Sequence, residues 1–272
     1  MRQTDEHVLP SADLVHGYIQ RICFKTGPPG LVGAELEWPV RRDTRPGAAV
    51  PVAELTALLE RAGPTPGGSR VTMEPGGQVE LSSQPAVGVD RCHARLAGDV
   101  GHLQTALAAR GLSLVPSGTD PDRPSRRQLT HPRYEAMAAY FAGRGETLGA
   151  AMMSSTAAVQ VNLDAGLDDR DVTARWGLLH AVGPVLVAAF ANSPRLRGRD
   201  TGWKSTRSAI WQHLDPSRTR PVTGGPPAAA YASYALDAPV MMLRRPGGRW
   251  QPDPGFTLRD WAARRVSDLA PP

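Results

Sequence analysis

Residues 71–83 read Val71-Thr-Met-Glu-Pro-Gly-Gly-Gln-Val-Glu-Leu-Ser-Ser83, and our prediction of the fold begins with them. Polar and apolar residues alternate here around a Pro-Gly-Gly turn. Because successive side chains of a strand point to opposite faces, we expect Val79 and Leu81 to lie on a core. Glu80 and its polar neighbours then lie on the opposite, open face, which Glu74 enters from the turn.

Two further stretches repeat this alternation. Gly33-Ala-Glu35-Leu-Glu37-Trp38 places two carboxylates at positions i and i+2 of a strand, roughly 7 Å apart on one face. Val159-Gln160-Val161-Asn162-Leu163 does the same with two amides. A lone Glu-x-Glu is typical of a solvated strand face, but three strands of this kind predict a sheet with one shared polar surface.

The shared surface predicts a metal-nucleotide site. It would collect the side chains of Glu35, Glu37, Glu74, Glu80, Gln160 and Asn162. Carboxylates crowded in this way repel one another unless a cation lies between them. Oxygen ligands suit a hard ion such as Mg²⁺, which in enzymes usually joins protein carboxylates to nucleotide phosphates.

Composition places the chain among ordinary globular proteins. Its 272 residues and 41% hydrophobic content are enough for one large domain or two modest ones. We expect no apolar run of membrane-spanning length, and residues 1–10 lack the basic-then-apolar pattern of a secretory signal. Cys23 and Cys92 are too few for a disulfide framework or a thiolate metal site. We therefore expect a cytoplasmic protein without a membrane partner.

The net charge of +5 is divided unevenly along the chain. Residues 1–194 carry a net charge of −2, whereas residues 195–265 carry +8, almost all of it from arginine. A GC-rich coding bias is one explanation. The other is an arginine-rich half that binds anions, since the guanidinium fork suits carboxylate and phosphate. Aromatic residues are sparse and no helix carries a continuous basic stripe, so we expect no nucleic-acid partner.

The periodicity of apolar residues predicts the elements along the chain. We expect helices over residues 12–24, 52–62, 88–110, 131–141, 168–191, 227–236 and 258–266. We expect strands over 31–39, 71–83, 112–116, 159–163 and 239–243. Gly183-Pro184 predicts a kink in the fifth helix.

Four segments together resemble the motifs of type 2 glutamate-cysteine ligases. They are Glu35-Leu-Glu37, Glu74-Pro-Gly-Gly-Gln-Val-Glu-Leu-Ser82, Met152-Met-Ser-Ser-Thr-Ala-Ala-Val-Gln-Val-Asn-Leu-Asp164 and Trp203-Lys-Ser-Thr-Arg-Ser-Ala-Ile-Trp211. Within that family the sequence is most similar to the actinobacterial branch that makes γ-glutamylcysteine for ergothioneine biosynthesis. The resemblance runs from about residue 11 to residue 261.

The resemblance implies both a fold and an activity. The fold would be α+β, with a largely antiparallel sheet of the glutamine-synthetase-like catalytic type and helices on one face. ATP would phosphorylate the γ-carboxylate of glutamate, and the amine of cysteine would then displace phosphate. In such a transfer, neutralisation of the charge on the phosphoryl group matters more than a protein nucleophile, which agrees with the predicted polar face. ATP and Mg²⁺ would be the cofactors, glutamate and cysteine the substrates, and no obligatory protein partner is inferred.

Matched position by position, the motifs imply roles for individual residues. The metal ligands would be Glu35, Glu37, Glu74, Glu80 and Gln160, of which Glu35, Glu37 and Glu80 would act in catalysis together with Arg207. Arg207 and Trp211 would hold the glutamate substrate, in a pocket lined by Met152, Met153 and Thr156. The nucleotide or its phosphates would contact Gln160, Asn162, Lys204 and Arg218.

Members of this family continue past the point at which this sequence ends, with a further arginine-rich and carboxylate-bearing strand. We therefore expect residues 1–272 to form a single catalytic domain that is truncated at its C-terminal end. Besides the glutamate-cysteine ligase, two alternatives stay open. One is a related carboxylate-amine ligase that uses another amine, and the other is a truncated, non-catalytic protein that binds ATP and glutamate.

Overall fold

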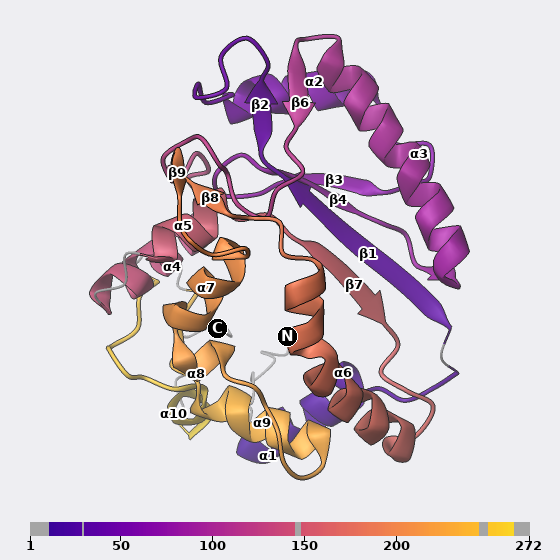
Figure 1. Ribbon diagram of the computed structural model, residues 1–272. Coiled ribbons are helices and arrows are strands. Elements are labelled where there is room, and N and C mark those ends of the chain that lie inside the picture. The colour runs from indigo at the N-terminus through magenta and orange to yellow at the C-terminus, as the bar shows by residue number, and fades with distance from the viewer. Residues whose placement is uncertain (1–10, 29, 145–147, 245–249, 264–272) are drawn as a thin grey trace, which may run out of the picture.

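A computed structural model describes residues 11–28, 30–144, 148–244 and 250–263 of the chain. Its architecture is α+β, built on an antiparallel sheet in which β1 lies between β4 and β7 (Figure 1). The strands of the sheet are β1 (Leu31–Trp38), β3 (Arg70–Met73), β4 (Val79–Ser82), β5 (Ala86–Val87) and β7 (Val159–Leu163). Two short pairs lie apart from it, β2 (Val40–Arg42) with β6 (Leu112–Leu114) and β8 (Arg195–Leu196) with β9 (Arg199–Asp200).

One face of the sheet packs against α2 (Val52–Ala62) and α3 (Val89–Ala108). The alternation of β1 and β4 places Leu36 opposite Leu81, and the side chain of Leu81 is fully buried. The apolar stripe of α3 closes this core with Leu96, Leu103 and Leu107. Burial of each such side chain stabilises the fold by about 1.5–3 kcal/mol. The predicted apolar face is thus confirmed for β1 and β4, whereas Val159, Val161 and Leu163 of β7 are exposed.

Three helices lie on the other side of the sheet from α3 (Figure 1): α4 (Pro132–Gly143), α5 (Leu148–Ser155) and α7 (Thr206–Leu214). They share a small core made by Tyr134, Phe141, Met153 and Leu214. The side chain of Ser205 accepts a hydrogen bond from Ser208 N–H and so caps α7. Helices therefore lie on both sides of the sheet, and the prediction that they lie on one face holds only for α2 and α3.

A further group of helices lies beyond the end of β7. Its members are α1 (Ala12–Tyr18), the π-helical turn η1 (Ile19–Cys23), α6 (Asp169–Ala189), α8 (Pro216–Thr219), α9 (Pro227–Asp237) and α10 (Leu258–Ala263). The ring of Phe24 packs edge-on against Trp176, at 5.3 Å between centroids, and against Tyr231 at 5.9 Å. This aromatic contact joins the first helix of the chain to α6 and α9.

Most predicted elements are present, with ends that differ by a few residues, and α6 continues through Pro184. The strand predicted over residues 239–243 is wrong. Pro239 makes an isolated bridge to Thr257, and Val240 N–H donates to Phe256 O, within a segment that forms no strand in the described chain. Helices α5, α7 and α8 were not predicted from the sequence. Residues 264–266 of the last predicted helix lie outside the described residues.

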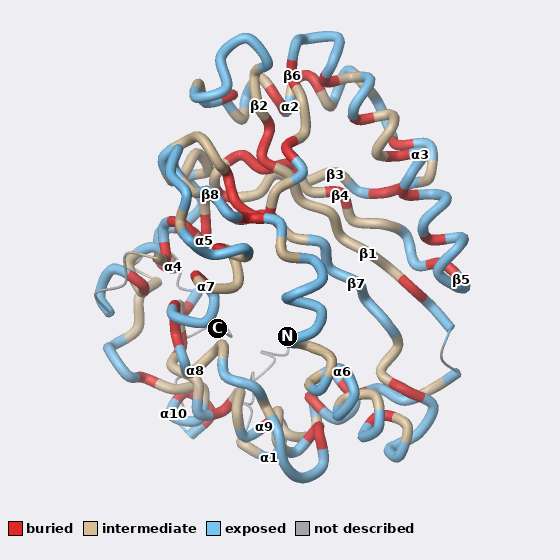
Figure 2. The backbone as a smooth tube through the Cα atoms, in the orientation of Figure 1, coloured by how far each residue is buried: buried red, intermediate tan, exposed pale blue. Residues whose placement is uncertain are grey.

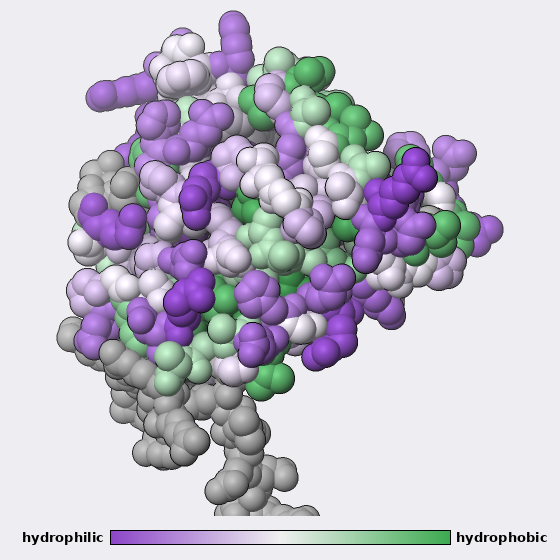
Figure 3. All heavy atoms as spheres, turned by 90° about the horizontal axis from the view of Figure 1, so that it is seen from below, coloured by the Kyte–Doolittle hydropathy of each residue, from purple (hydrophilic) through white to green (hydrophobic). Residues whose placement is uncertain are grey.

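Helix α6 departs from the expectation that no apolar run has membrane-spanning length. Among the described residues, this helix is long and apolar enough to cross a membrane, by length and composition alone. Only Val172 of its residues is buried, and Leu178 and Val185 are more than half exposed. Figure 2 shows the resulting exposed stretch of α6, and Figure 3 shows apolar patches among polar residues on the face seen from below.

Candidate active site

The polar face of the sheet brings the predicted carboxylates and amides together. In antiparallel strands, residues directly opposite each other point to the same face. Glu35 lies opposite Ser82 of β4 and Gln160 of β7, and Glu37 lies opposite Glu80. The prediction of one polar surface shared by β1, β4 and β7 is thus confirmed.

Hydrogen bonds connect the acidic strand to the amide strand. Gln160 Nε2 donates to Glu35 Oε2 at 2.9 Å and lies 3.4 Å from Glu37 Oε1. Asn162 Nδ2 donates to Glu35 Oε1 at 3.3 Å. The amides therefore orient both carboxylates of β1.

The two carboxylates that face each other across β1 and β4 are held by further partners. Glu37 N–H donates to Ala158 O at 2.9 Å, and Glu37 Oε2 accepts from Ala158 N–H at 3.0 Å. Glu80 accepts a hydrogen bond from the hydroxyl of Thr72 on β3. The two bonds to Ala158 fix Glu37 at the residue just before β7, and the Thr72 hydroxyl holds the carboxylate of Glu80.

A pocket of about 330 Å³ opens beside this end of the polar face, between the sheet, the β3–β4 turn and helices α4, α5 and α7. The residues predicted for the site that line it are Glu37, Glu74, Met152, Met153, Thr156, Gln160, Arg207 and Trp211. The other lining residues were not assigned to the site from the sequence: they are Pro75, Gln78, Arg133, Tyr134 and Met137. Tyr134 and Met137 are three residues apart on α4, a spacing that places two side chains on one helix face. This spacing could have indicated that the two residues line the same surface.

Burial makes the charges of this pocket interact strongly. Burial and then the Glu74 carboxylate raise the pKa of Glu37 to about 7, while the Ala158 hydrogen bond and Arg207 act in the opposite direction. Burial and the Glu80 carboxylate also raise the pKa of Glu74. Burial lowers the pKa of Arg207, whose Nε has no hydrogen-bond partner among the described residues. The pocket thus holds carboxylates without full charge compensation and a guanidinium with a free donor.

The remaining predicted residues lie outside this lining. Glu35, Glu80 and Asn162 are on the polar face next to the pocket. Lys204 is exposed in the loop before α7. Arg218 Nε lies 3.4 Å from the buried carboxylate of Asp215, and the Arg218 guanidinium donates to Pro239 O. The pocket cations that the structure provides are therefore Arg133 and Arg207 rather than Lys204 and Arg218.

The oxygen atoms of the polar face suit a hard cation chemically. Within the described part of the chain, however, no three His, Cys, Asp or Glu side chains are close enough to hold an ion by themselves. Mg²⁺ usually takes one or two carboxylates from a protein and completes its shell with water and substrate phosphates. The face therefore fits a cation that arrives with a nucleotide better than a site closed by protein ligands alone.

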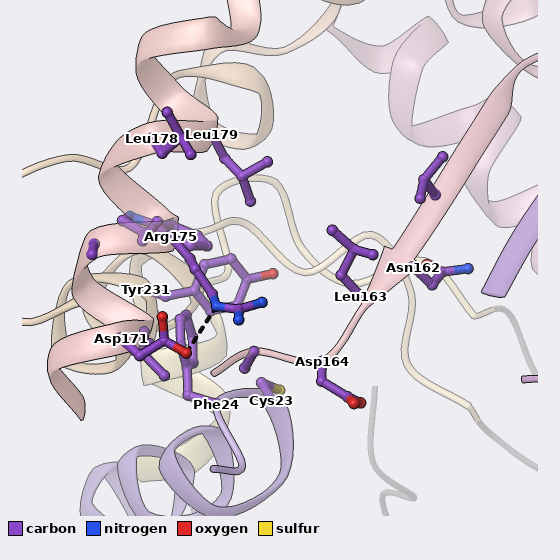
Figure 4. A pocket seen from close by; sticks show the side chains of 15 residues that line it. Cys23, Phe24, Asn162, Leu163, Asp164, Asp171, Arg175, Leu178, Leu179 and Tyr231 are labelled. Carbon is purple, nitrogen blue, oxygen red and sulfur yellow. Dashed lines mark hydrogen bonds and ion pairs between the residues drawn. The ribbon is translucent and has the colours of Figure 1, made fainter. Parts of the chain in front are cut away.

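A larger cavity, of about 890 Å³, lies between β7, α6, η1 and α9. Figure 4 shows Leu163 of β7 and Leu179 of α6 around the same space. Its charged groups are already bonded: Arg175 donates to Asp171 at 2.9 Å, and Asp164 accepts from backbone N–H groups just before and at the start of β1. We therefore assign the chemistry to the smaller pocket, where charged groups are incompletely paired.

Comparison with known proteins gives one consistent result. Residues 31–272 match the family model described as glutamate-cysteine ligase family 2. The chain is 44% identical over 265 residues to the glutamate–cysteine ligase EgtA of Mycolicibacterium smegmatis, and 45% identical over 233 residues to that of Mycobacterium tuberculosis. It is 31% identical over 213 residues to the chloroplastic glutamate–cysteine ligase of Brassica juncea.

The coverage of these matches is unequal. They extend over 94%, 84% and 75% of this chain, respectively. The chain in turn spans 61% and 54% of the length of the two mycobacterial ligases and 40% of the plant protein. The similarity thus covers most of this chain and about half of each relative.

Proposed function

Because the chain belongs to glutamate-cysteine ligase family 2, we propose that it joins the γ-carboxylate of glutamate to the amine of cysteine at the expense of ATP. The observation that carries the proposal is the polar sheet face, with its carboxylates and amides, beside a pocket whose helical side bears the half-buried Arg207. We extend the proposal to a glutamine-synthetase-like catalytic sheet, which the antiparallel order β3-β4-β1-β7 supports.

The side of the pocket formed by α5 and α7 carries side chains suited to binding glutamate. The guanidinium of Arg207 suits a carboxylate, because its planar fork donates two parallel hydrogen bonds. Trp211 follows one turn later on α7, and both residues line the pocket. Met152 and Met153 offer apolar contacts for the methylene groups of the substrate. We propose that Arg207 binds a carboxylate of glutamate and so directs the γ-carboxylate toward the sheet.

The sheet face has the chemistry to bind the phosphates. In the proposed reaction an oxygen of the γ-carboxylate attacks the terminal phosphorus of ATP and ADP leaves. The amine of cysteine then attacks the acyl carbon, and phosphate leaves as γ-glutamylcysteine forms. One or two of the carboxylates of Glu35, Glu37, Glu74 and Glu80 would hold Mg²⁺ that arrives with ATP, and the ion would supply charge neutralisation at the transferring group. Gln160 and Asn162 hold the carboxylates of β1 in place for this task.

The finer parts of the proposal rest on the relatives. A role in ergothioneine biosynthesis is supported by the 44% and 45% identity to the two mycobacterial ligases named EgtA. We place the activity in the cytoplasm, where ATP and reduced cysteine are available together.

The test is ADP release with glutamate, measured with and without cysteine. The wild-type chain should release ADP and form γ-glutamylcysteine, and Glu35→Gln should lose most of this activity because it removes a carboxylate from the face. Glu54→Gln is the matched control, since Glu54 is paired with Arg42 away from the pocket. Turnover with another amine but not with cysteine would indicate a related ligase. Binding of ATP and glutamate in calorimetry without ADP release would indicate a non-catalytic binding protein.

A further inference from the structure

The β3–β4 turn sets the position of one pocket carboxylate. Glu74 is the first residue after β3, and its N–H donates to Gln78 O at 2.7 Å. Gly77 N–H donates back to Glu74 O at 2.6 Å, and Gly77 has φ 87°, which favours glycine. Because Glu74 belongs to the turn itself, anything that holds the turn also fixes the backbone position from which the Glu74 side chain enters the pocket that it shares with Glu37.

Residue 128, far away in the sequence, holds the turn from outside. Gln128 N–H donates to Pro75 O at 2.7 Å, and Leu129 N–H donates to the same oxygen at 3.1 Å. The side-chain Nε2 of Gln128 donates to Gly76 O at 2.8 Å. Two consecutive carbonyl groups of the turn are thus bound by one short segment.

The same side chain is anchored to the start of α2. Gln128 Nε2 donates to Val50 O at 3.2 Å, and Gln128 Oε1 accepts from Val52 N–H at 3.2 Å. Only a primary amide provides two donors and an acceptor in this arrangement. Helix α2 contributes the buried Leu55 to the main core, so the amide connects the turn to a rigid element.

The opposite side of the turn is equally constrained. Gly76 N–H donates to Gln78 Oε1 at 2.9 Å, and Gln78 Nε2 donates to Thr156 O at 2.8 Å. A Cβ added at Gly76 would overlap the backbone of Ser154, and one added at Gly77 would come within 2.5 Å of Gln128 Nε2. Gln78 lines the pocket, whereas Gln128 does not.

We propose that Gln128 is a positioning residue for Glu74. It acts through the carbonyl groups of Pro75 and Gly76, which it ties to α2, and so fixes the backbone from which the Glu74 side chain reaches the polar face. The consequence for catalysis rests on the proposed function, in which that face binds a divalent cation together with ATP. The mechanical part, that Gln128 fixes the turn, stands on the hydrogen bonds alone.

The test compares Gln128→Glu with Gln84→Glu in the full chain. The first change keeps the shape of the side chain but removes both donors and places a negative charge beside Gly76 O and Val50 O. Gln84 is the matched control: it is exposed, and its Nε2 makes one hydrogen bond, to Gly68 O at 3.1 Å. Gln128→Met and Gln84→Met form a second pair, in case a buried charge prevents folding.

Two measurements separate positioning from general stability. Amide hydrogen exchange at Gly77 and Leu129 should become at least about tenfold faster in Gln128→Glu, while exchange at Leu107 in the core of α3 stays unchanged. Affinity for Mn²⁺, measured by electron paramagnetic resonance, should fall about 10–100-fold, as for the loss of a residue that supports a metal ligand. Gln84→Glu should change neither quantity.

The outcomes are distinct. Unchanged exchange at Gly77 and Leu129 would overturn the proposal, and so would unchanged Mn²⁺ affinity in a variant whose turn has loosened. Faster exchange at Leu107 to the same degree would overturn it as well, since a loss of global stability explains that result. Failure of the wild-type chain to bind Mn²⁺ overturns the proposed function instead, and the exchange data then decide by themselves whether Gln128 fixes the turn.

Discussion

At the scale of single residues, Glu37 makes the site sensitive to pH. Burial and the neighbouring Glu74 carboxylate raise the pKa of Glu37 to about 7, so a proton would compete near neutrality with the cation that we propose for this face. We expect the affinity for Mn²⁺ to rise with pH, by up to about tenfold per unit, from about pH 5.5 to about pH 7 and then to level off. Electron paramagnetic resonance titrations across this range measure it.

The variant Glu37→Gln tests which carboxylate is responsible. Its amide binds no proton in this range, so the affinity should be lower throughout and its slope with pH should be reduced. The stability of the fold should change with pH in the opposite direction to the Mn²⁺ affinity. Folding raises the pKa of Glu37 from 4.5, so the stabilisation from its protonated form is present below about pH 4.5 and is lost as the pH rises through about 7. Without metal, urea unfolding should show wild type losing stability relative to Glu37→Gln over that range, and parallel curves would contradict the assignment.

Arg207 is the pocket residue from which we expect the largest effect on glutamate binding. Its half-buried guanidinium also lowers the pKa of Glu37, so Arg207→Ala should raise that pKa further. We expect the KM for glutamate to rise at least about 100-fold, because truncation of a buried charged partner typically costs about 2–5 kcal/mol. Arg207→Lys should restore little, since lysine lacks the planar fork. The control is Arg220→Ala, an exposed arginine that lies over the Tyr234 ring, and equal effects of the two alanine variants would contradict the assignment.

At the scale of elements, the β3–β4 turn depends on close packing against α5. A Cβ at Gly76 would overlap Ser154, so Gly76→Ala should destabilise the fold by about 1–3 kcal/mol in urea unfolding. Gly98 is exposed in the middle of α3 with open space around it, so Gly98→Ala should stabilise the fold by about 0.5–1 kcal/mol. Opposite signs for the same substitution would show that the contact, and not the loss of glycine, causes the effect. Two changes of the same sign would contradict this account of the turn.

The same elements show what the sequence made predictable. Strands β1 and β7 and helix α2 were predicted closely because alternation and helical spacing are local signals that the core later uses. Helix α7 was missed because arginine, glycine and proline dominate the stretch around it. Its buried residues Thr206, Ile210 and Leu214 do recur at intervals of four, and that signal was available. The prediction over residues 239–243 failed because apolar character alone does not provide a partner strand.

At the scale of the whole molecule, the site is assembled from segments that local patterns cannot bring together. Glu35 and Gln160 form a hydrogen bond although 125 residues separate them. The motifs identified which polar residues belong to one site, whereas the register of β1 with β7 and the packing of α4 and α7 are long-range properties. Arg133 and Gln128 were missed for that reason: neither lies in a motif, and each acquires its role only when α4 and the β3–β4 turn meet the sheet.

The apolar surface beside β7 predicts how the whole chain behaves in solution. Within the described structure, β7 pairs with β1 alone, and all five of its residues are exposed. An exposed strand edge with apolar side chains is a template for pairing with another chain, so we expect self-association in sedimentation velocity at micromolar concentration. Val161→Lys should shift the chain toward the monomer, because a charge on an edge strand opposes such pairing. Val87→Lys adds the same charge at another exposed valine, and an equal shift in both variants would show that net charge, rather than the β7 edge, controls association.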